Sequence, residues 1–123
     1  MNQFFSLGQA TSLWAHNFRL ISFLAMTTVH ILACGALYWS IHSQEEVVIL
    51  RYNAYLGIDL LGVWWQLFLI PAVSYFFILI NFLLIQILDS RGYNKLALLL
   101  ILGSWFVTGS SVVAIIALSF INV

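Results

Sequence analysis

The sequence predicts an all-α integral membrane protein with three transmembrane helices and a structured outer loop between helices one and two. Of the 123 residues, 63% are hydrophobic and only 7% are charged, whereas a soluble domain carries roughly a quarter charged residues. The charged side chains also leave three uncharged stretches, 20–44, 60–88 and 96–123. Each exceeds the ~20 residues that cross a bilayer core as a helix. This composition excludes a soluble globular domain, a disordered chain and a basic nucleic-acid-binding protein.

Each stretch favours a helix over a barrel strand, because runs such as 96–102 do not alternate apolar and polar residues. Backbone groups in lipid also need hydrogen-bond partners inside their own segment. We therefore expect one membrane domain with six parts in chain order. These are an interfacial segment (1–17), helix one (20–41), an outer loop (42–65), helix two (66–88), a cytoplasmic turn (89–95) and helix three (96–121).

The few basic residues indicate the orientation of the chain. Arg19 precedes helix one, and Arg91 and Lys95 lie between helices two and three, whereas the 42–65 loop holds only Arg51. Cytoplasmic loops carry the excess of Lys and Arg. We therefore expect the N-terminus and the short turn in the cytoplasm and the C-terminus outside, in a bacterial inner membrane.

The outer loop combines turn-forming residues with interfacial aromatics. Gly57 and Gly62 permit turns with positive φ, and the side chains of Asn53 and Asp59 can bond nearby backbone groups. Aromatic rings with a polar tip suit the membrane interface. The loop is therefore expected to fold onto the outer membrane surface, with its tyrosines and tryptophans at that depth: Tyr52, Tyr55, Trp64 and Trp65.

A further pattern runs from this loop into helix two: Tyr52, Asn53, Gly57, Asp59 and Pro71. It resembles a DUF1648-like outer motif (domain of unknown function 1648) of small bacterial membrane proteins, Pro-x-His-[Tyr/Phe]-Asn-x-x-x-Gly-x-Asp, followed by an aromatic residue and a helix with an early proline. Related segments occur in immunity and signalling membrane proteins. Arg51 stands where the group usually has His, and Ile49 where it has Pro. Over about residues 45–80, the resemblance implies topology and an outward-facing motif without implying an activity: Arg51, Tyr52, Asn53, Gly57, Asp59, Trp64 and Trp65.

Small polar side chains recur at helical spacing inside the spans. A rise of about 1.5 Å per residue places those of different helices at matching depths. One level holds Thr27, Asn81 and Ser104, and another holds Cys34, Ser74 and Ser111. We expect an internal polar seam whose interhelical hydrogen bonds each contribute ~0.6 kcal/mol. Its members are Thr27, His30, Cys34, Ser74, Asn81, Ser104, Thr108 and Ser111.

Haem ligation is the alternative interpretation of two histidines. His16 and His30 are fourteen residues apart, a spacing that returns to nearly the same helical face and is familiar from helices that ligate two haems. Helices two and three offer no partner histidine, so a second copy would have to supply one. We expect instead that His30 is hydrogen-bonded to Asn81 or to a Ser or Thr, and that no cofactor is present.

Catalytic and metal-binding patterns are missing from the sequence. No nucleophile–base–acid set, phosphate-binding glycine loop or carboxylate pair is visible. His42, Glu45 and Glu46 lack the number and spacing of ligands that metal sites use. We therefore expect no enzyme activity and no metal site.

Three hypotheses of function follow. The first is a non-enzymatic small membrane subunit that packs against other membrane chains in a larger assembly. The second is a homo-oligomeric channel or transporter, in which Pro71 kinks helix two and the polar seam lines a path. The third is a receptor or immunity-type protein whose outer loop binds a peptide or lipid. The expected partners are the lipid bilayer and other membrane chains or copies of itself, with no nucleic acid.

Overall fold

Three long helices form the protein, and a small β-hairpin joins the first two. The computed structural model describes residues 2–41 and 47–122, with backbone alone for 2–13 and 59. Within them the helices long and apolar enough to cross a membrane are Trp14–Ile41, Trp64–Ser90 and Asn94–Ile121. The predicted fold class, an all-α membrane protein with three such helices, is therefore confirmed. In chain order the elements are α1 (Asn2–Ile41), β1 (Val47–Asn53), β2 (Gly57–Val63), a 3-10 helix η1 (Trp64–Phe68), α2 (Leu69–Ser90) and α3 (Asn94–Ile121).

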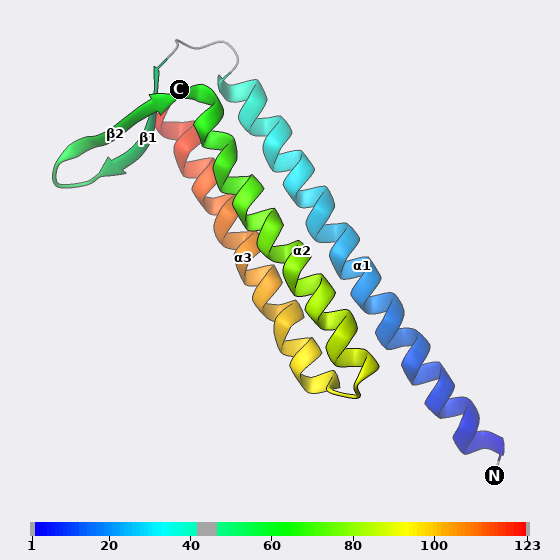
Figure 1. Ribbon diagram of the computed structural model, residues 1–123. Coiled ribbons are helices and arrows are strands. Elements are labelled where there is room, and N and C mark those ends of the chain that lie inside the picture. The colour runs from blue at the N-terminus through cyan, green and yellow to red at the C-terminus, as the bar shows by residue number, and fades with distance from the viewer. Residues whose placement is uncertain (1, 42–46, 123) are drawn as a thin grey trace.

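The helices run alongside one another, up, down and up, and α1 is much longer than its neighbours (Figure 1). The 1–17 segment, expected at the interface, is helical from Asn2 onward and continues into span one without a break. No proline interrupts it, because the single proline of the chain is Pro71. As a result the first part of α1 projects beyond the turn that joins α2 to α3 (Figure 1).

The second span begins with η1 and only then becomes α-helical. Gln66 Oε1 accepts a hydrogen bond of 2.9 Å from the Val63 N–H just before η1, which satisfies a backbone group that a helix start leaves open. Pro71 lies in the first turn of α2, where the N–H that proline lacks has no intrahelical partner in any case. Its position therefore gives no reason for a kink inside the span.

The turn between α2 and α3 is closed by backbone hydrogen bonds. Gly92 has a φ of +82°, its N–H bonds the Asp89 carbonyl at 3.0 Å, and the Tyr93 N–H bonds the Leu88 carbonyl at 2.9 Å. This pair of bonds is a Schellman motif, in which a glycine takes the left-handed conformation after the helix end. The turn thus fixes α2 and α3 as antiparallel neighbours.

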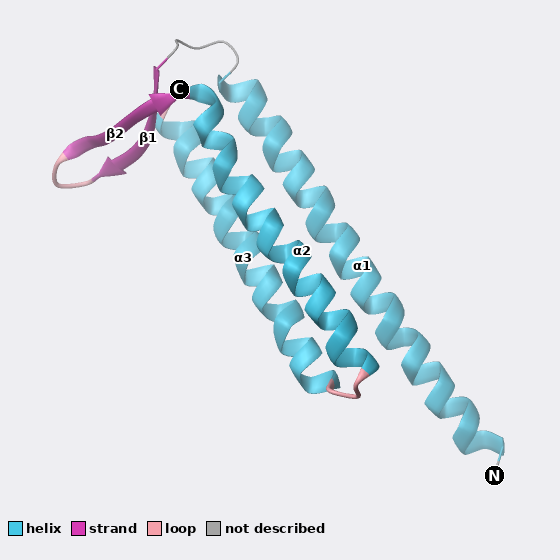
Figure 2. Ribbon diagram, viewed as in Figure 1, coloured by secondary structure: helices cyan, strands magenta, loops and turns pink. Residues whose placement is uncertain are grey.

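The outer loop is a two-stranded antiparallel hairpin (Figure 2). Its strands pair from Val47 opposite Val63 to Asn53 opposite Gly57. At the tip, Gly57 has a φ of +76°, and Asn53 Oδ1 accepts a hydrogen bond of 2.9 Å from the Tyr55 N–H. Both features belong to tight turns.

Gly62 differs from its expected role in a turn. It lies inside β2 and is not among the glycines with positive φ. A Cβ at this position would overlap the Leu50 side chain and Gln66 Oε1. Gly62 is therefore required because neighbouring side chains approach its backbone closely.

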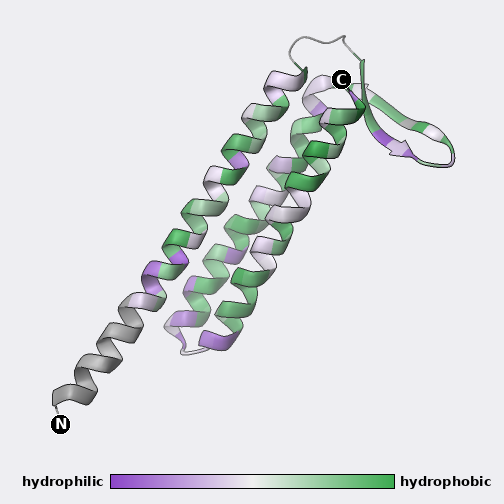
Figure 3. Ribbon diagram, turned by 180° about the vertical axis from the view of Figure 1, so that it is seen from behind, coloured by the Kyte–Doolittle hydropathy of each residue, from purple (hydrophilic) through white to green (hydrophobic). Residues whose placement is uncertain are grey.

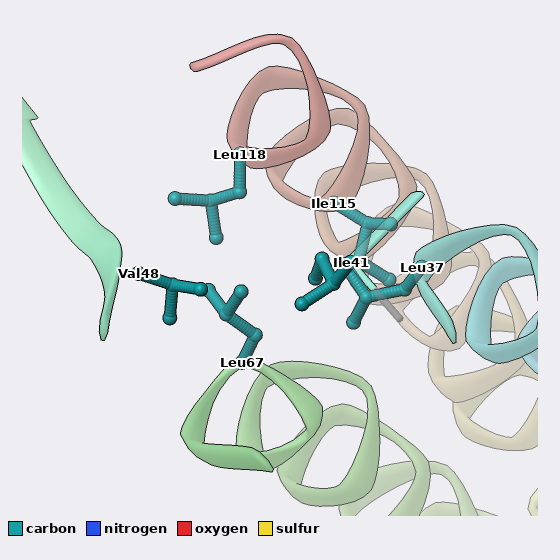
Figure 4. Close-up of a cluster of buried hydrophobic side chains, with 6 residues drawn as sticks. All are labelled: Leu37, Ile41, Val48, Leu67, Ile115 and Leu118. Carbon is teal, nitrogen blue, oxygen red and sulfur yellow. The ribbon is translucent and has the colours of Figure 1, made fainter. Parts of the chain in front are cut away.

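Two contacts fix the hairpin to the end of the helices. Asn122 is 8% exposed; its Oδ1 accepts from the Ile49 N–H at 2.7 Å and its Nδ2 donates to the Ile49 carbonyl at 2.9 Å. The side chain thus pairs with β1 as a neighbouring strand would. A cluster of buried apolar side chains adds packing around the same end (Figure 4): Leu37, Ile41, Val48, Leu67, Ile115 and Leu118.

At the opposite end, an ion pair joins α1 to α2. Arg19 Nη1 contacts Asp89 Oδ2, with the two side chains 7% and 33% exposed, respectively, and Arg19 Nε donates to the Ala15 carbonyl at 3.0 Å. Hydrophilic residues gather at this end, whereas the helices above it are mostly apolar (Figure 3). A buried guanidinium needs such a partner because desolvated charge is costly.

The ion pair predicts that Asp89→Asn destabilises the bundle by about 1–3 kcal/mol, because the buried Arg19 keeps its charge but loses its carboxylate. The exposure of Asp89 keeps this cost below that of a fully buried pair. The measurement is the free energy of unfolding in detergent micelles. Arg91→Gln, which removes an exposed charge of the same turn, is the control and is expected to change stability by less than about 0.5 kcal/mol. Equal effects of both variants would contradict the pairing.

The Asn122 contact predicts that Asn122→Ala loosens the hairpin and leaves the helices intact. Loss of the bonds to Ile49 is worth about 1–2 kcal/mol. The Ile49 amide should therefore exchange with deuterium roughly tenfold faster. Ser119→Ala is the matched control, because that hydroxyl bonds only the Ile115 carbonyl of its own helix among the described contacts. Unchanged exchange at Ile49 would show that Asn122 does not hold β1.

Candidate functional site

A chain of hydrogen bonds crosses all three helices at His30. Its Nε2 lies 2.8 Å from Ser74 Oγ, and Ser74 Oγ lies 3.0 Å from Ser111 Oγ. On the other side of the ring, Nδ1 lies 2.9 Å from the Met26 carbonyl oxygen. The side chains of His30, Ser74 and Ser111 are all buried. These hydrogen bonds join α1, α2 and α3 at one level.

The partners of His30 define where its protons lie. A carbonyl oxygen only accepts, so Nδ1 carries a proton and donates it to Met26. In the neutral ring Nε2 is then an acceptor for the Ser74 hydroxyl, which also lies as a donor toward Ser111 Oγ. Ser74 Oγ also lies 3.0 Å from the Pro71 carbonyl oxygen. The single proton of the Ser74 hydroxyl therefore has three acceptors within reach: His30 Nε2, Ser111 Oγ and the Pro71 carbonyl.

Two further interhelical hydrogen bonds lie closer to the α2–α3 turn than the contact at His30. Asn81 Nδ2 donates to Ser104 Oγ at 3.1 Å and links α2 to α3. Thr27 Oγ1 lies 2.9 Å from the Phe23 carbonyl and 3.1 Å from the Tyr75 hydroxyl. Since Thr27 spends its one proton on the carbonyl, Tyr75 donates to Thr27. This bond links α1 to α2.

The structure brings together most of the predicted seam and distributes it over these bonds. Ser74 meets Ser111, and Asn81 meets Ser104, at the levels expected from helical rise. Thr108 is buried against its neighbours but bonds the Ser104 carbonyl of its own helix at 2.9 Å. His30 joins Ser74 rather than Asn81. The seam therefore consists of separate groups of interhelical hydrogen bonds. The group that includes His30 connects all three helices.

A groove lies beside the seam, between α1 and α2. Its volume is about 510 Å³, and its walls are largely apolar, as in many small-molecule sites. The half-buried Cys34 faces this groove rather than bonding to Ser74 or Ser111. The lining consists of Thr27, His30, Ile31 and Cys34 from α1 and of Phe68, Pro71, Ala72 and Tyr75 from η1 and α2.

The histidines of the haem alternative occupy different surroundings. His16 is exposed, whereas both ring nitrogens of His30 are engaged, one by Met26 and one by Ser74. A metal bound at Nε2 would have to displace Ser74. Among the side chains that the structure describes (14–41, 47–58 and 60–122), no group of three His, Cys, Asp or Glu is placed to hold a metal ion. His42, Glu45 and Glu46 lie outside the described residues.

The residues of the predicted outward motif lie on the hairpin and on η1. Arg51 and Tyr52 are exposed on β1, and Trp65 is exposed on η1. Trp64 packs edge-on against Phe68, with ring centroids 6.1 Å apart. The side chain of Asp59 lies outside the described set. Asn53 and Gly57 shape the hairpin tip, so two residues of the motif have a structural role.

Several important contacts were not anticipated from the sequence. Tyr75 bonds Thr27, and Phe23 stacks on Phe82 with ring centroids 4.2 Å apart. Helical spacing offered a signal for both, because these residues lie at the depths where α1 and α2 run side by side. Asn122 gave only a weak signal, as a polar residue at the end of an apolar helix.

The hydrogen bonds that connect His30, Ser74 and Ser111 predict that Ser74→Ala destabilises the protein by about 1–3 kcal/mol, because His30 Nε2 remains buried without its partner. The measurement is the midpoint of thermal unfolding in micelles, followed by circular dichroism. Ser110→Ala is the matched control: Ser110 is exposed on α3, and its hydroxyl bonds only the Phe106 carbonyl among the described contacts. If the Ser74 variant is as stable as the Ser110 variant, the hydrogen bonds of Ser74 do not contribute to the stability of the protein.

Comparison with known proteins gives no relative. No protein-family model, curated protein or solved structure matches the chain. The DUF1648-like resemblance of residues 45–80 therefore stays a prediction, and the chain is identified here only as an integral membrane protein of three apolar helices.

Proposed function

We propose that the chain is a non-enzymatic small membrane subunit that packs against another membrane protein through the face of α3 opposite the polar seam. The observation that supports this most strongly is a shallow groove of about 650 Å³ on that face. Small residues form its floor, and Trp105 and Phe106 stand at one end. We call it the α3 groove: Gly109, Ser110, Val113, Ala114 and Ala117.

Gly109 has no role inside this chain that requires a glycine. A Cβ at Gly109 would meet nothing within 4 Å, and its φ is not positive. Glycine in a helix interior costs about 1 kcal/mol relative to alanine in water. In membranes, small residues let neighbouring helices approach closely. Gly35 and Gly103 also meet nothing within 4 Å, so it is the position of Gly109 in the α3 groove that favours contact with a helix of another chain.

The polar seam supports packing better than it supports a channel. Ser104, Thr108 and Ser111 are each less than a tenth exposed. They bond within the chain, so they are not available to line a path between copies. Pro71 lies in the first turn of α2 and does not provide the hinge that a channel hypothesis invoked.

We also propose the orientation that the basic residues predict, with the N-terminus and the α2–α3 turn in the cytoplasm of a bacterial inner membrane. Arg19 lies at the same end of the bundle as the turn, because it contacts Asp89. Arg91 and Lys95 belong to that end as well. Three of the four basic residues thus gather on one side, as cytoplasmic segments do.

The proposal predicts that Gly109→Leu weakens association without unfolding the chain. A leucine would fill the α3 groove, so co-purification of the partner in mild detergent should fall about tenfold or more, in line with a lost packing contact. Gly35→Leu is the matched control, because Gly35 is exposed on α1 and a Cβ there also meets nothing within 4 Å. It should leave co-purification unchanged.

A photo-crosslinking residue at Val113, with Leu24 of α1 as the reference site, separates the hypotheses. A subunit should form one adduct with a different protein, from Val113 and not from Leu24. An adduct of twice the chain mass would favour assembly of identical copies. Absence of any adduct from Val113 in native membranes would overturn the proposal.

A further inference from the structure

The hairpin is an apolar element that the helices do not cover. At its tip Tyr55 is 97% and Leu56 77% exposed. Along its strands the exposed apolar side chains include Val47, Ile58, Leu60 and Leu61. An apolar surface of this extent on both strands is unfavourable in water and marks an interaction surface.

The position of the hairpin limits what can cover it. It leaves the bundle at the end where α1 and α3 finish, and it extends sideways rather than continuing the helix axes (Figures 1 and 3). In a bilayer crossed by these helices, such an element runs along the membrane surface. Its base is continuous with exposed Trp64, Trp65 and Leu69, at the start of the second span.

The hairpin is held in this direction. Asn122 bonds both backbone groups of Ile49, and Val48 is 2% exposed within the cluster that packs the helix ends. Gln66 ties the end of β2 to η1. These contacts involve three elements, so the sideways orientation follows from the packing at the base.

The hydrogen-bonding groups along the strand edges limit how deeply the hairpin can lie in the bilayer. A two-stranded sheet has two outer edges whose N–H and C=O groups point away from the partner strand, and Asn122 bonds those of Ile49. Unpaired backbone groups are not tolerated in the hydrocarbon core. The apolar side chains disfavour water, and the edges disfavour hydrocarbon. Both conditions are met together at the boundary between headgroups and acyl chains, where aromatic residues concentrate.

We propose that the hairpin lies in the headgroup–acyl boundary of the adjoining leaflet, with Tyr55 and Leu56 in direct contact with lipid. Residues 47–63 carry one Arg and one Asp, so this segment has no net charge to draw it to anionic lipid. The contact is therefore apolar, and it should be equally strong in phosphatidylcholine and in mixtures with an anionic lipid, at low and high salt.

The test uses an environment-sensitive fluorophore on single cysteines, in a Cys34→Ala background, with the chain reconstituted in phosphatidylcholine nanodiscs. Tyr55→Cys reports on the tip. Phe106→Cys, 78% exposed on α3, is the lipid-embedded reference, and Arg91→Cys, exposed in the α2–α3 turn, is the hydrated reference. Quenching is measured with aqueous iodide and with lipids that carry a nitroxide at headgroup depth or at mid-chain depth.

The expected result at position 55 is iodide quenching at least threefold weaker than at position 91. The headgroup nitroxide should quench this probe more strongly than the mid-chain nitroxide, the reverse of the order at position 106. Iodide quenching equal to that at position 91, with no lipid quenching, would overturn the proposal. Protection that appears only when several chains occupy one nanodisc would also overturn it, in favour of a second copy.

A second variant tests whether the label itself, rather than the hairpin tip, causes the contact with lipid. Leu56→Glu should raise iodide quenching of the position-55 probe toward that of position 91, because a carboxylate opposes insertion. The probe at position 106 should stay unchanged, which verifies that the helices remain inserted. No change at position 55 would contradict direct lipid contact by the tip.

Discussion

The absence of water around a membrane span is the constraint on which this structure depends. Each polar group there must find a partner within the protein. His30, Ser74 and Ser111 meet this requirement by hydrogen bonds that connect the three helices. Arg19 and Asp89 meet it by an ion pair at the end of the bundle near the α2–α3 turn. Asn122 does the same for a strand that has only one neighbour. The polar side chains thus specify which helices meet and at what level, while the apolar ones supply contact with lipid and with each other.

Much of the bundle follows from the sequence, because it depends on two regular quantities, helix rise and bilayer thickness. These place Ser74 level with Ser111 and Asn81 level with Ser104. The hairpin does not follow in the same way. Leu60 and Leu61 are adjacent and break the alternation that indicates a strand, so the loop predicts turns and no sheet. The Asn122–Ile49 pair joins the end of α3 to β1 across 73 residues of sequence, and helical spacing carries no information about such a contact.

The glycines illustrate why residue type alone underdetermines role. Gly57 and Gly92 are required for their left-handed backbone, which the turns demand. Gly62 is required because Leu50 and Gln66 occupy the space of a side chain. Gly109 meets neither condition within the chain. The same residue type therefore indicates a left-handed backbone in two cases and close packing in a third, whereas Gly109 leaves open space on the surface of α3.

The length of α1 has a mechanical consequence. Residues 2–18 precede the buried Arg19 and amount to about 25 Å of continuous helix beyond the level of Asp89 (Figure 1). A force applied to that projecting end acts with a long moment arm about the ion pair. On the other side of Arg19, the same helix continues into the stretch that borders the groove next to α2. Because the helix is continuous, a tilt of the projecting end also tilts the part of α1 that forms one wall of the groove.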